Sequence, residues 1–176
     1  MAPQAVYVLN RREYKESSLL LDIFSLEYGR LNIIANGALK SKKSWSAMLQ
    51  AFQPLLVAWS GRSTLKTLIS IEAPSSAITL TGTRLFSAYY LNELLLKLLP
   101  QGQGTSNGFN SSDCFLMYSK TLEDLVNYEN IELPLRRFEF HLLSELGVFP
   151  DFSKDIHGQM IESDLMYYLI PQEGFQ

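Results

Sequence analysis

The sequence predicts an α+β protein in which a small β-barrel precedes an α-helical domain. Two observations support this prediction. The first 75 of 176 residues contain five short runs of aliphatic and β-branched residues separated by turn residues. From about residue 83 onward, longer apolar stretches with helical spacing replace them. A hydrophobic content of 47% is enough for a substantial core.

The five expected strands cover residues 5–9, 18–24, 31–35, 55–59 and 65–71. Residues 60–63 read Ser-Gly-Arg-Ser, which is typical of a hairpin turn between the last two strands. Between the third and fourth strands, residues 44–49 favour a short helix. Five strands with a helical insert after the third match a Greek-key barrel of the OB type, although other small barrels share this pattern.

The helical half follows a change of composition at Ala73-Pro74-Ser75-Ser76. We therefore expect one domain over residues 1–78 and a helical domain over residues 79–176, with a short hairpin near residues 165–176. The expected helices cover residues 83–99, 113–128 and 133–146, and a flexible connection covers residues 102–108. The first helix is apolar on most sides, which is typical of the centre of a bundle. Pro134 suits a first turn, and Gly147 suits a helix end.

The net charge of −3 is unevenly distributed. Residues 1–75 carry nine basic and five acidic side chains, which gives +4, whereas residues 76–176 carry six and thirteen, which gives −7. A short chain can show such a difference by chance. Because binding of a polyanion depends on local charge, the difference makes the barrel the candidate nucleic-acid-binding part.

The sequence does not favour an enzyme. It has one cysteine, Cys114, two histidines, His141 and His157, and no motif for nucleophilic catalysis or phosphate binding. We therefore expect no metal and no cofactor. The sequence starts without a secretory leader and contains no apolar run long enough to span a bilayer, so a cytoplasmic protein without membrane contact is expected.

Basic residues in the barrel half are the candidate DNA contacts. Lys40, Lys42 and Lys43 lie within four positions and are followed by Trp45, a combination that suits phosphate binding and base stacking. The other basic candidates follow the first strand, begin the third or flank the hairpin turn: Arg11, Arg12, Lys15, Arg30, Arg62 and Lys66. Two other interpretations are solvated loops and a Trp45 indole that packs the insert helix onto the barrel.

The chain resembles a known family over nearly its whole length. The segments that carry the resemblance are, in order, VLNRREYKESSLLLDIFSLEYGRL, IIANGALKSKKS, LQAFQPLL, GRSTLKTLISIEA, AYYLNELLLKLL and LPLRRFEFHLLSELG. They are similar to bacterial RecO DNA repair proteins in sequence, order and spacing. The resemblance implies an OB barrel followed by a helical domain, in agreement with the patterns above.

The resemblance also implies a function. RecO proteins are recombination mediators of the RecF pathway that bind single- and double-stranded DNA and anneal single strands. With RecR they help RecA replace single-strand binding protein (SSB). The implied partners of this chain are therefore DNA, RecR and the C-terminal tail of SSB, and the implied location is the cytoplasm, at the nucleoid.

Two departures from the family bear on this chain. Many members hold zinc through four cysteines after the third helix, whereas the corresponding stretch here reads GVFPDFSKDIHGQM and resembles a metal-free branch. The family normally continues beyond the position of Gln176. We therefore expect a fragment or a truncated product, in which the pocket for the SSB tail is incomplete.

The third expected helix would provide the SSB-tail site that the resemblance implies. Arg136 or Arg137 would pair with the terminal carboxylate of the tail, and apolar residues such as Leu142 would hold its final Phe ring. An ideal helix places four apolar residues on one face: Leu135, Phe138, Leu142 and Leu146. Both arginines then lie at the margin of that face or beyond it. Alternatively, they are solvated or cap a neighbouring helix.

Two other functions are compatible with a basic barrel. One is an OB-fold RNA-binding or translation-associated module, which would prefer RNA and leaves the acidic helical half unexplained. The other is a structural adaptor whose barrel contacts only RecR and binds no nucleic acid alone. Annealing of DNA strands distinguishes both from a recombination mediator.

Overall fold

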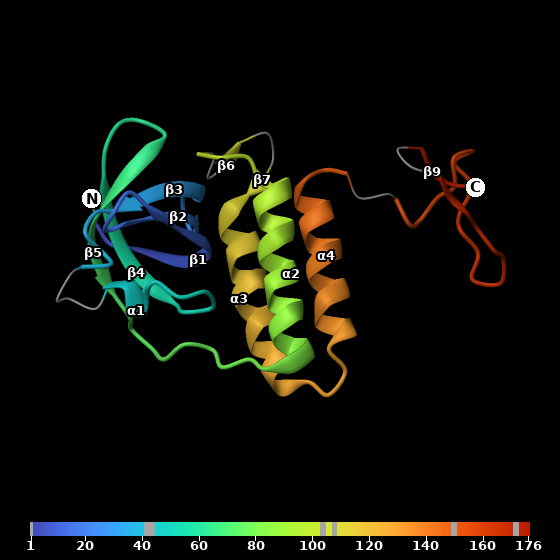
Figure 1. Ribbon diagram of the computed structural model, residues 1–176. Coiled ribbons are helices and arrows are strands. Elements are labelled where there is room, and N and C mark those ends of the chain that lie inside the picture. Colours follow the sequence, from blue (N-terminus) through green and yellow to red (C-terminus); the bar gives the residue numbers. More distant parts are fainter. Residues whose placement is uncertain (1, 41–44, 103–104, 107–108, 149–150, 171–172) are drawn as a thin grey trace.

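The computed structural model describes residues 2–40, 45–102, 105–106, 109–148, 151–170 and 173–176. Figure 1 shows a β-barrel at one end, the long helices side by side next to it, and a small C-terminal segment beyond the last long helix. In the described parts of the chain, no helix has the length and apolar character needed to cross a membrane.

The barrel is closed and has five strands. These are β1 (Gln4–Tyr14), β2 (Ser18–Ser25), β3 (Gly29–Ala35), β4 (Leu55–Ser60) and β5 (Leu65–Glu72). Their order is β1-β2-β3-β5-β4, and β4 pairs with β1 to close the barrel. Only the β3–β5 pairing is parallel among these strands. The short helix α1 (Trp45–Met48) lies between β3 and β4. The predicted OB-type barrel with a helical insert is confirmed.

Alternation along the strands separates the two faces of the barrel wall. In β3, Leu31, Ile33 and Ala35 are buried, while the residues between them are partly exposed. Strand β1 is different, because its first half is covered on both sides. Val6 and Val8 belong to the core inside the barrel, whereas Tyr7 and Leu9 pack against the helices.

Strand β1 is also longer than predicted. It continues to Tyr14 and pairs with the whole of β2, with Tyr14 opposite Ser18. The second half of β1 is exposed and polar, so no apolar alternation marks it in the sequence. As a result, Arg11 and Arg12 lie within the strand rather than in a loop after it.

The helices are α2 (Gly82–Leu98), α3 (Ser111–Asn127) and α4 (Glu132–Glu145), close to the predicted ranges. Asn110 caps α3, because its side-chain oxygen accepts from the backbone amides of Ser112 and Asp113. The predicted apolar face of α4 is confirmed by four residues buried in the core or packed against it: Leu135, Phe138, Leu142 and Leu146.

Two short hairpins complete the fold. Strands β6 (Thr105–Ser106) and β7 (Phe109–Asn110) pair where only a flexible connection was predicted. Strands β8 (Leu169–Ile170) and β9 (Gly174–Phe175) form the hairpin expected near the C-terminal residues.

Buried hydrogen bonds join the helices to the barrel. The Asn92 side-chain amide donates to the carbonyl oxygen of Leu9 at 2.9 Å and accepts from the Tyr118 hydroxyl at 2.5 Å. Ser111 donates to the carbonyl oxygen of Ser25 at 3.1 Å. Because barrel residues such as Tyr7 also belong to the apolar core of the helices, the helices are packed directly on the barrel wall.

Candidate nucleic-acid interface

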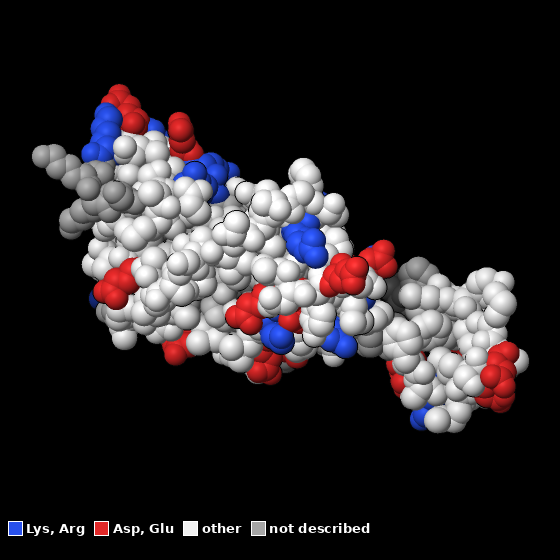
Figure 2. Space-filling view, turned by 90° about the horizontal axis from the view of Figure 1, so that it is seen from below, with Lys and Arg blue, Asp and Glu red and all other residues white. Residues whose placement is uncertain are grey.

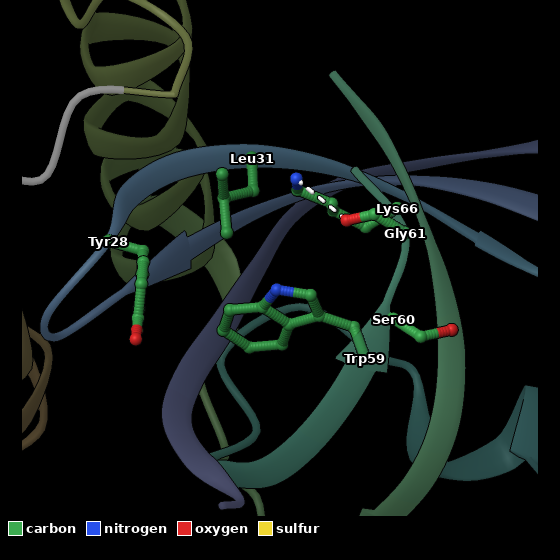
Figure 3. A pocket seen from close by; sticks show the side chains of 6 residues that line it. All are labelled: Tyr28, Leu31, Trp59, Ser60, Gly61 and Lys66. Carbon is green, nitrogen blue, oxygen red and sulfur yellow. Dashed lines mark hydrogen bonds between the residues drawn. The ribbon is translucent and has the colours of Figure 1, made fainter. Parts of the chain in front are cut away.

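A groove opens on the barrel beside the hairpin that joins β4 and β5 (Figure 3). It consists of two cavities of about 450 and 230 Å³, which share Tyr28, Leu31 and Lys66 as lining residues. We call it the hairpin groove. Its lining comprises those three residues with Trp59, Asn32 and Arg62, together with residues 60–61, 63–64 and 101–102.

Local backbone features direct the hairpin side chains. The β4–β5 register shifts between Ala58 and Trp59, and such a bulge changes the direction in which a side chain points. Gly61 has a φ of +114°, in a region that favours glycine, and it lets the chain turn back immediately after β4. The Lys66 ammonium then donates to the carbonyl oxygen of Gly61 at 3.1 Å, which leaves two of its three protons for a ligand.

Two aromatic rings form the apolar part of the groove. The rings of Tyr28 and Trp59 meet nearly at right angles, with their centroids 5.5 Å apart. Trp59 is only 4% exposed and belongs to the barrel core, whereas Tyr28 is 40% exposed. Figure 3 shows the indole between Tyr28 and the hairpin. The exposed tyrosine ring is thus supported by a ring that is fixed in the core.

The loop after α2 lines the smaller cavity together with the hairpin. The Gly102 amide donates to the carbonyl oxygen of Arg30 at 2.8 Å, so the loop runs beside the start of β3. The Arg30 guanidinium donates to the carbonyl oxygens of Leu96 and Leu99 at 2.5 and 3.1 Å, which caps the end of α2. It also lies 3.4 Å from the Asp22 carboxylate.

These contacts give Arg30, a predicted DNA contact, a structural role. Its side chain is only 17% exposed and is directed at protein acceptors, so its role is to join α2 to the barrel. Its charge suggested a phosphate contact, but the sequence does not show that the end of α2 lies next to β3.

The groove is locally basic. Arg62 and Lys66 are its charged residues, and no carboxylate occurs among the lining residues that the structure describes. On the molecular face in Figure 2, by contrast, basic and acidic side chains are interspersed. Two cations beside an exposed aromatic ring are the combination that binds phosphates and stacks bases of single strands.

Two predicted DNA contacts, Arg11 and Trp45, have protein contacts at the insert helix α1. The Arg11 guanidinium donates to the carbonyl oxygens of Ser46 and Leu49 at 2.8 and 3.3 Å. Trp45 is half-buried and packs against the barrel core beside Met48. The structure therefore supports the packing interpretation of Trp45.

A second basic group lies at the turn between β1 and β2. The Lys15 ammonium is 5.3 Å from the centre of the Tyr14 ring, and Lys40 pairs with Glu16 at 3.8 Å. Arg12 is exposed on β1. The predicted Lys42 and Lys43 lie outside the described residues. The structure thus divides the basic candidates between this turn and the hairpin groove.

On α4, the structure separates the three residues predicted to bind the SSB tail. The Arg136 guanidinium pairs with Glu139 at 2.5 Å, and Glu139 also accepts from the Tyr90 hydroxyl at 2.9 Å. Arg137 is exposed. Leu142 is 1% exposed and lies in the core shared by the three helices, so it does not line a surface pocket in this structure.

Sequence reasoning missed Tyr28, Asn32 and Trp59. A tryptophan directly before a Ser-Gly-Arg turn and a tyrosine directly before a Gly-Arg pair were the available signals, because both place aromatic rings next to basic turns.

Within the part of the chain that the structure describes, no group of three His, Cys, Asp or Glu residues is arranged to hold a metal ion.

The fold defines the class of protein first: an OB-type barrel packed on a helical domain. Comparisons with known proteins then define the family. Residues 1–77 match the family described as "Recombination protein O N terminal", and residues 80–174 match "Recombination protein O C terminal".

Similar proteins agree with both matches. The chain is 43% identical to DNA repair protein RecO of Aliivibrio salmonicida over 176 residues, which covers 98% of this chain and 70% of that protein. It is 41% identical over 170 residues to the RecO protein of Alteromonas mediterranea, which covers 96% of this chain and 70% of that protein. It is 40% identical to the RecO protein of Haemophilus influenzae over 98% of this chain and 71% of that protein. The chain belongs to the RecO family of DNA repair proteins, so the resemblance seen in the sequence is confirmed.

Proposed function

We propose that this protein is a non-enzymatic recombination mediator whose barrel binds single-stranded DNA through the hairpin groove. The observation that carries the proposal is the exposed Tyr28 ring beside Arg62 and Lys66, without a carboxylate among the described lining residues. The cations neutralise backbone phosphates without reading sequence. Complementary strands held this way come close enough to pair, which is annealing.

Membership of the RecO family supports the rest of the proposed role. In the RecF pathway, the protein acts with RecR to load RecA on strands coated with SSB. The basic turn with Arg12, Lys15 and Lys40 extends the DNA contact beyond the groove, to duplex as well as single strands. The protein works in the cytoplasm, at the nucleoid.

The helical domain would bind the acidic tail of SSB. Arg137 is the better candidate for the terminal carboxylate, because it is exposed while Arg136 is paired with Glu139. An exposed arginine can form a bidentate contact with a carboxylate. Apolar residues at the surface of the helices would hold the final Phe ring of the tail, since Leu142 is buried.

The test is a salt titration of binding to a labelled single strand. With about four to six phosphates bound, log affinity should fall against log salt with a slope of about −3 to −4. The double variant Arg62→Glu/Lys66→Glu should weaken binding and make the slope shallower by about one. Strand annealing, measured with two complementary labelled strands, should slow in parallel.

A matched control is Lys120→Glu/Lys154→Glu, which changes the net charge equally but places the change on α3 and in the C-terminal segment. It should leave affinity and slope nearly unchanged. Equal losses for the two double variants would mean that only net charge matters and would refute the groove as the binding site. A preference for an RNA strand of the same sequence would favour the RNA-binding alternative.

A further inference from the structure

We infer that the hairpin groove holds one unstacked nucleobase, so that the barrel distinguishes single-stranded from double-stranded DNA. This inference rests on the proposed function, because it names the part of the strand that enters the groove. The larger cavity, of about 450 Å³, lies within the range of about 300–1,000 Å³ typical of small-ligand sites. The groove is therefore large enough to hold a base rather than only a phosphate.

The aromatic wall favours a base over any other part of DNA. Tyr28 presents a ring that is 40% exposed and is supported from one side by the buried Trp59 indole. A nucleobase can stack on such a ring only when its own face is free. In a duplex both faces of each base are stacked on neighbours, so a base must leave the stack or come from a single strand.

Polar groups in the adjoining cavity suit the edge of a base. The side-chain oxygen of Asn32 is buried and has no hydrogen-bond partner among the described residues. Asn32 lines a cavity of about 230 Å³ that Gln101 and Arg62 also line. A buried acceptor without a partner indicates a missing donor, and an exocyclic amine or ring N–H of a base can provide one.

The cations suit the phosphates on either side of that base. Lys66 lines both cavities, and its bond to the carbonyl oxygen of Gly61 holds the ammonium at the rim of the hairpin. Arg62 lies in the turn itself. One nucleotide would therefore place its base against Tyr28 and its phosphates near the two cations. Duplex DNA would reach only the cations.

The two tryptophans of the chain, Trp45 and Trp59, make this arrangement measurable. In the variant Trp45→Phe, Trp59 is the only tryptophan, and its emission reports on the groove. The probes are a labelled oligothymidine, an abasic strand of the same length and a duplex. Polarization gives the affinity for each probe, and tryptophan emission shows whether a base has entered. We expect oligothymidine to change the emission, and we expect the abasic strand and the duplex to bind without changing it.

The substitution Tyr28→Ala tests the stacking directly. It should lower the affinity for oligothymidine by about 5- to 150-fold, the range measured for base–aromatic stacking, and leave the abasic strand nearly unaffected. Tyr28→Phe keeps the ring and should restore the affinity. Tyr128→Ala is the matched control, because Tyr128 is 42% exposed but follows α3, away from the groove lining.

The outcomes separate this inference from the proposed function. Equal losses for oligothymidine and the abasic strand in Tyr28→Ala would overturn the base pocket, and so would oligothymidine that binds without changing Trp59 emission. In both cases DNA binding by the barrel would stand. Failure of every probe to bind the unsubstituted protein would overturn the proposed function and the inference together.

Discussion

Replacement of Arg30 by methionine should destabilise the whole protein. Arg30 is the side chain through which the end of α2 is bonded to the barrel, and methionine keeps much of its apolar length without any donor. The substitution leaves the carbonyl oxygens of Leu96 and Leu99 without their guanidinium partner. It also leaves the Asp22 carboxylate, whose side chain is 12% exposed, without its cation.

The expected loss follows from these contacts. A hydrogen bond from a charged group contributes about 1.5–3 kcal/mol, and Arg30 makes two of them to main-chain carbonyls. Water can replace part of this, because the side chain is 17% exposed and the helix end is near solvent. The mostly buried Asp22 adds a penalty of its own. Together these effects predict a loss of about 2–4 kcal/mol in the free energy of unfolding.

The measurement is urea unfolding followed by circular dichroism, with the double variant Arg30→Met/Asp22→Asn beside the single one. The double variant should recover part of the loss, because it removes the unpaired carboxylate. A loss below about 0.5 kcal/mol, typical of exposed surface positions, would refute the joining role. Under that result, weaker DNA binding by Arg30→Met would restore Arg30 as a phosphate contact.

Two further predictions concern the helical half. Burial and the charge of Glu145 raise the pKa of the Cys114 thiol to about 12. In the unfolded chain the thiol ionises near pH 8.5, so between pH 8 and 10 the folded state keeps a proton that the unfolded state loses. The free energy of unfolding, measured in urea, should therefore fall by about 2 kcal/mol over this pH range. Cys114→Ala should flatten this pH dependence, and an equally steep pH dependence in Cys114→Ala would contradict the prediction. Arg137→Glu should weaken binding of a labelled acidic peptide ending in Phe by about 10-fold or more and leave DNA affinity unchanged. Arg136→Glu should weaken peptide binding less, because Arg136 is paired with Glu139. Equal peptide affinity for both variants and the unsubstituted protein would exclude a role for either arginine.

The sequence predicted the barrel well because short runs of aliphatic and β-branched residues between turn residues mark its strands, and β3 also alternates between buried and partly exposed residues. The same reasoning failed for the second half of β1, where both faces are exposed and no alternation remains. On α4 the apolar face was recognised correctly, but the sequence did not show that Leu142 is buried within it. A leucine in the middle of an apolar helix face is far more often in the core than in a ligand pocket, and here the other helices cover it.

The basic residues show why a site is harder to predict than a strand. Their charge is evident in the sequence, but their partners are set by tertiary structure. Arg11 is bonded to the insert helix, and Arg30 to the end of α2, 66 residues further along the chain. Arg62 and Lys66 line the groove with Tyr28, on a hairpin that has a bulge between Ala58 and Trp59 and a turn at Gly61.

The contact between the two halves of the molecule also bears on the groove. One wall belongs to the barrel hairpin, and another is formed by residues 101–102 after α2, which Arg30 and the Gly102 amide hold against β3. The position of that wall therefore depends on the packing of the helices. A groove fixed by both halves loses little conformational freedom when a strand binds, which favours affinity.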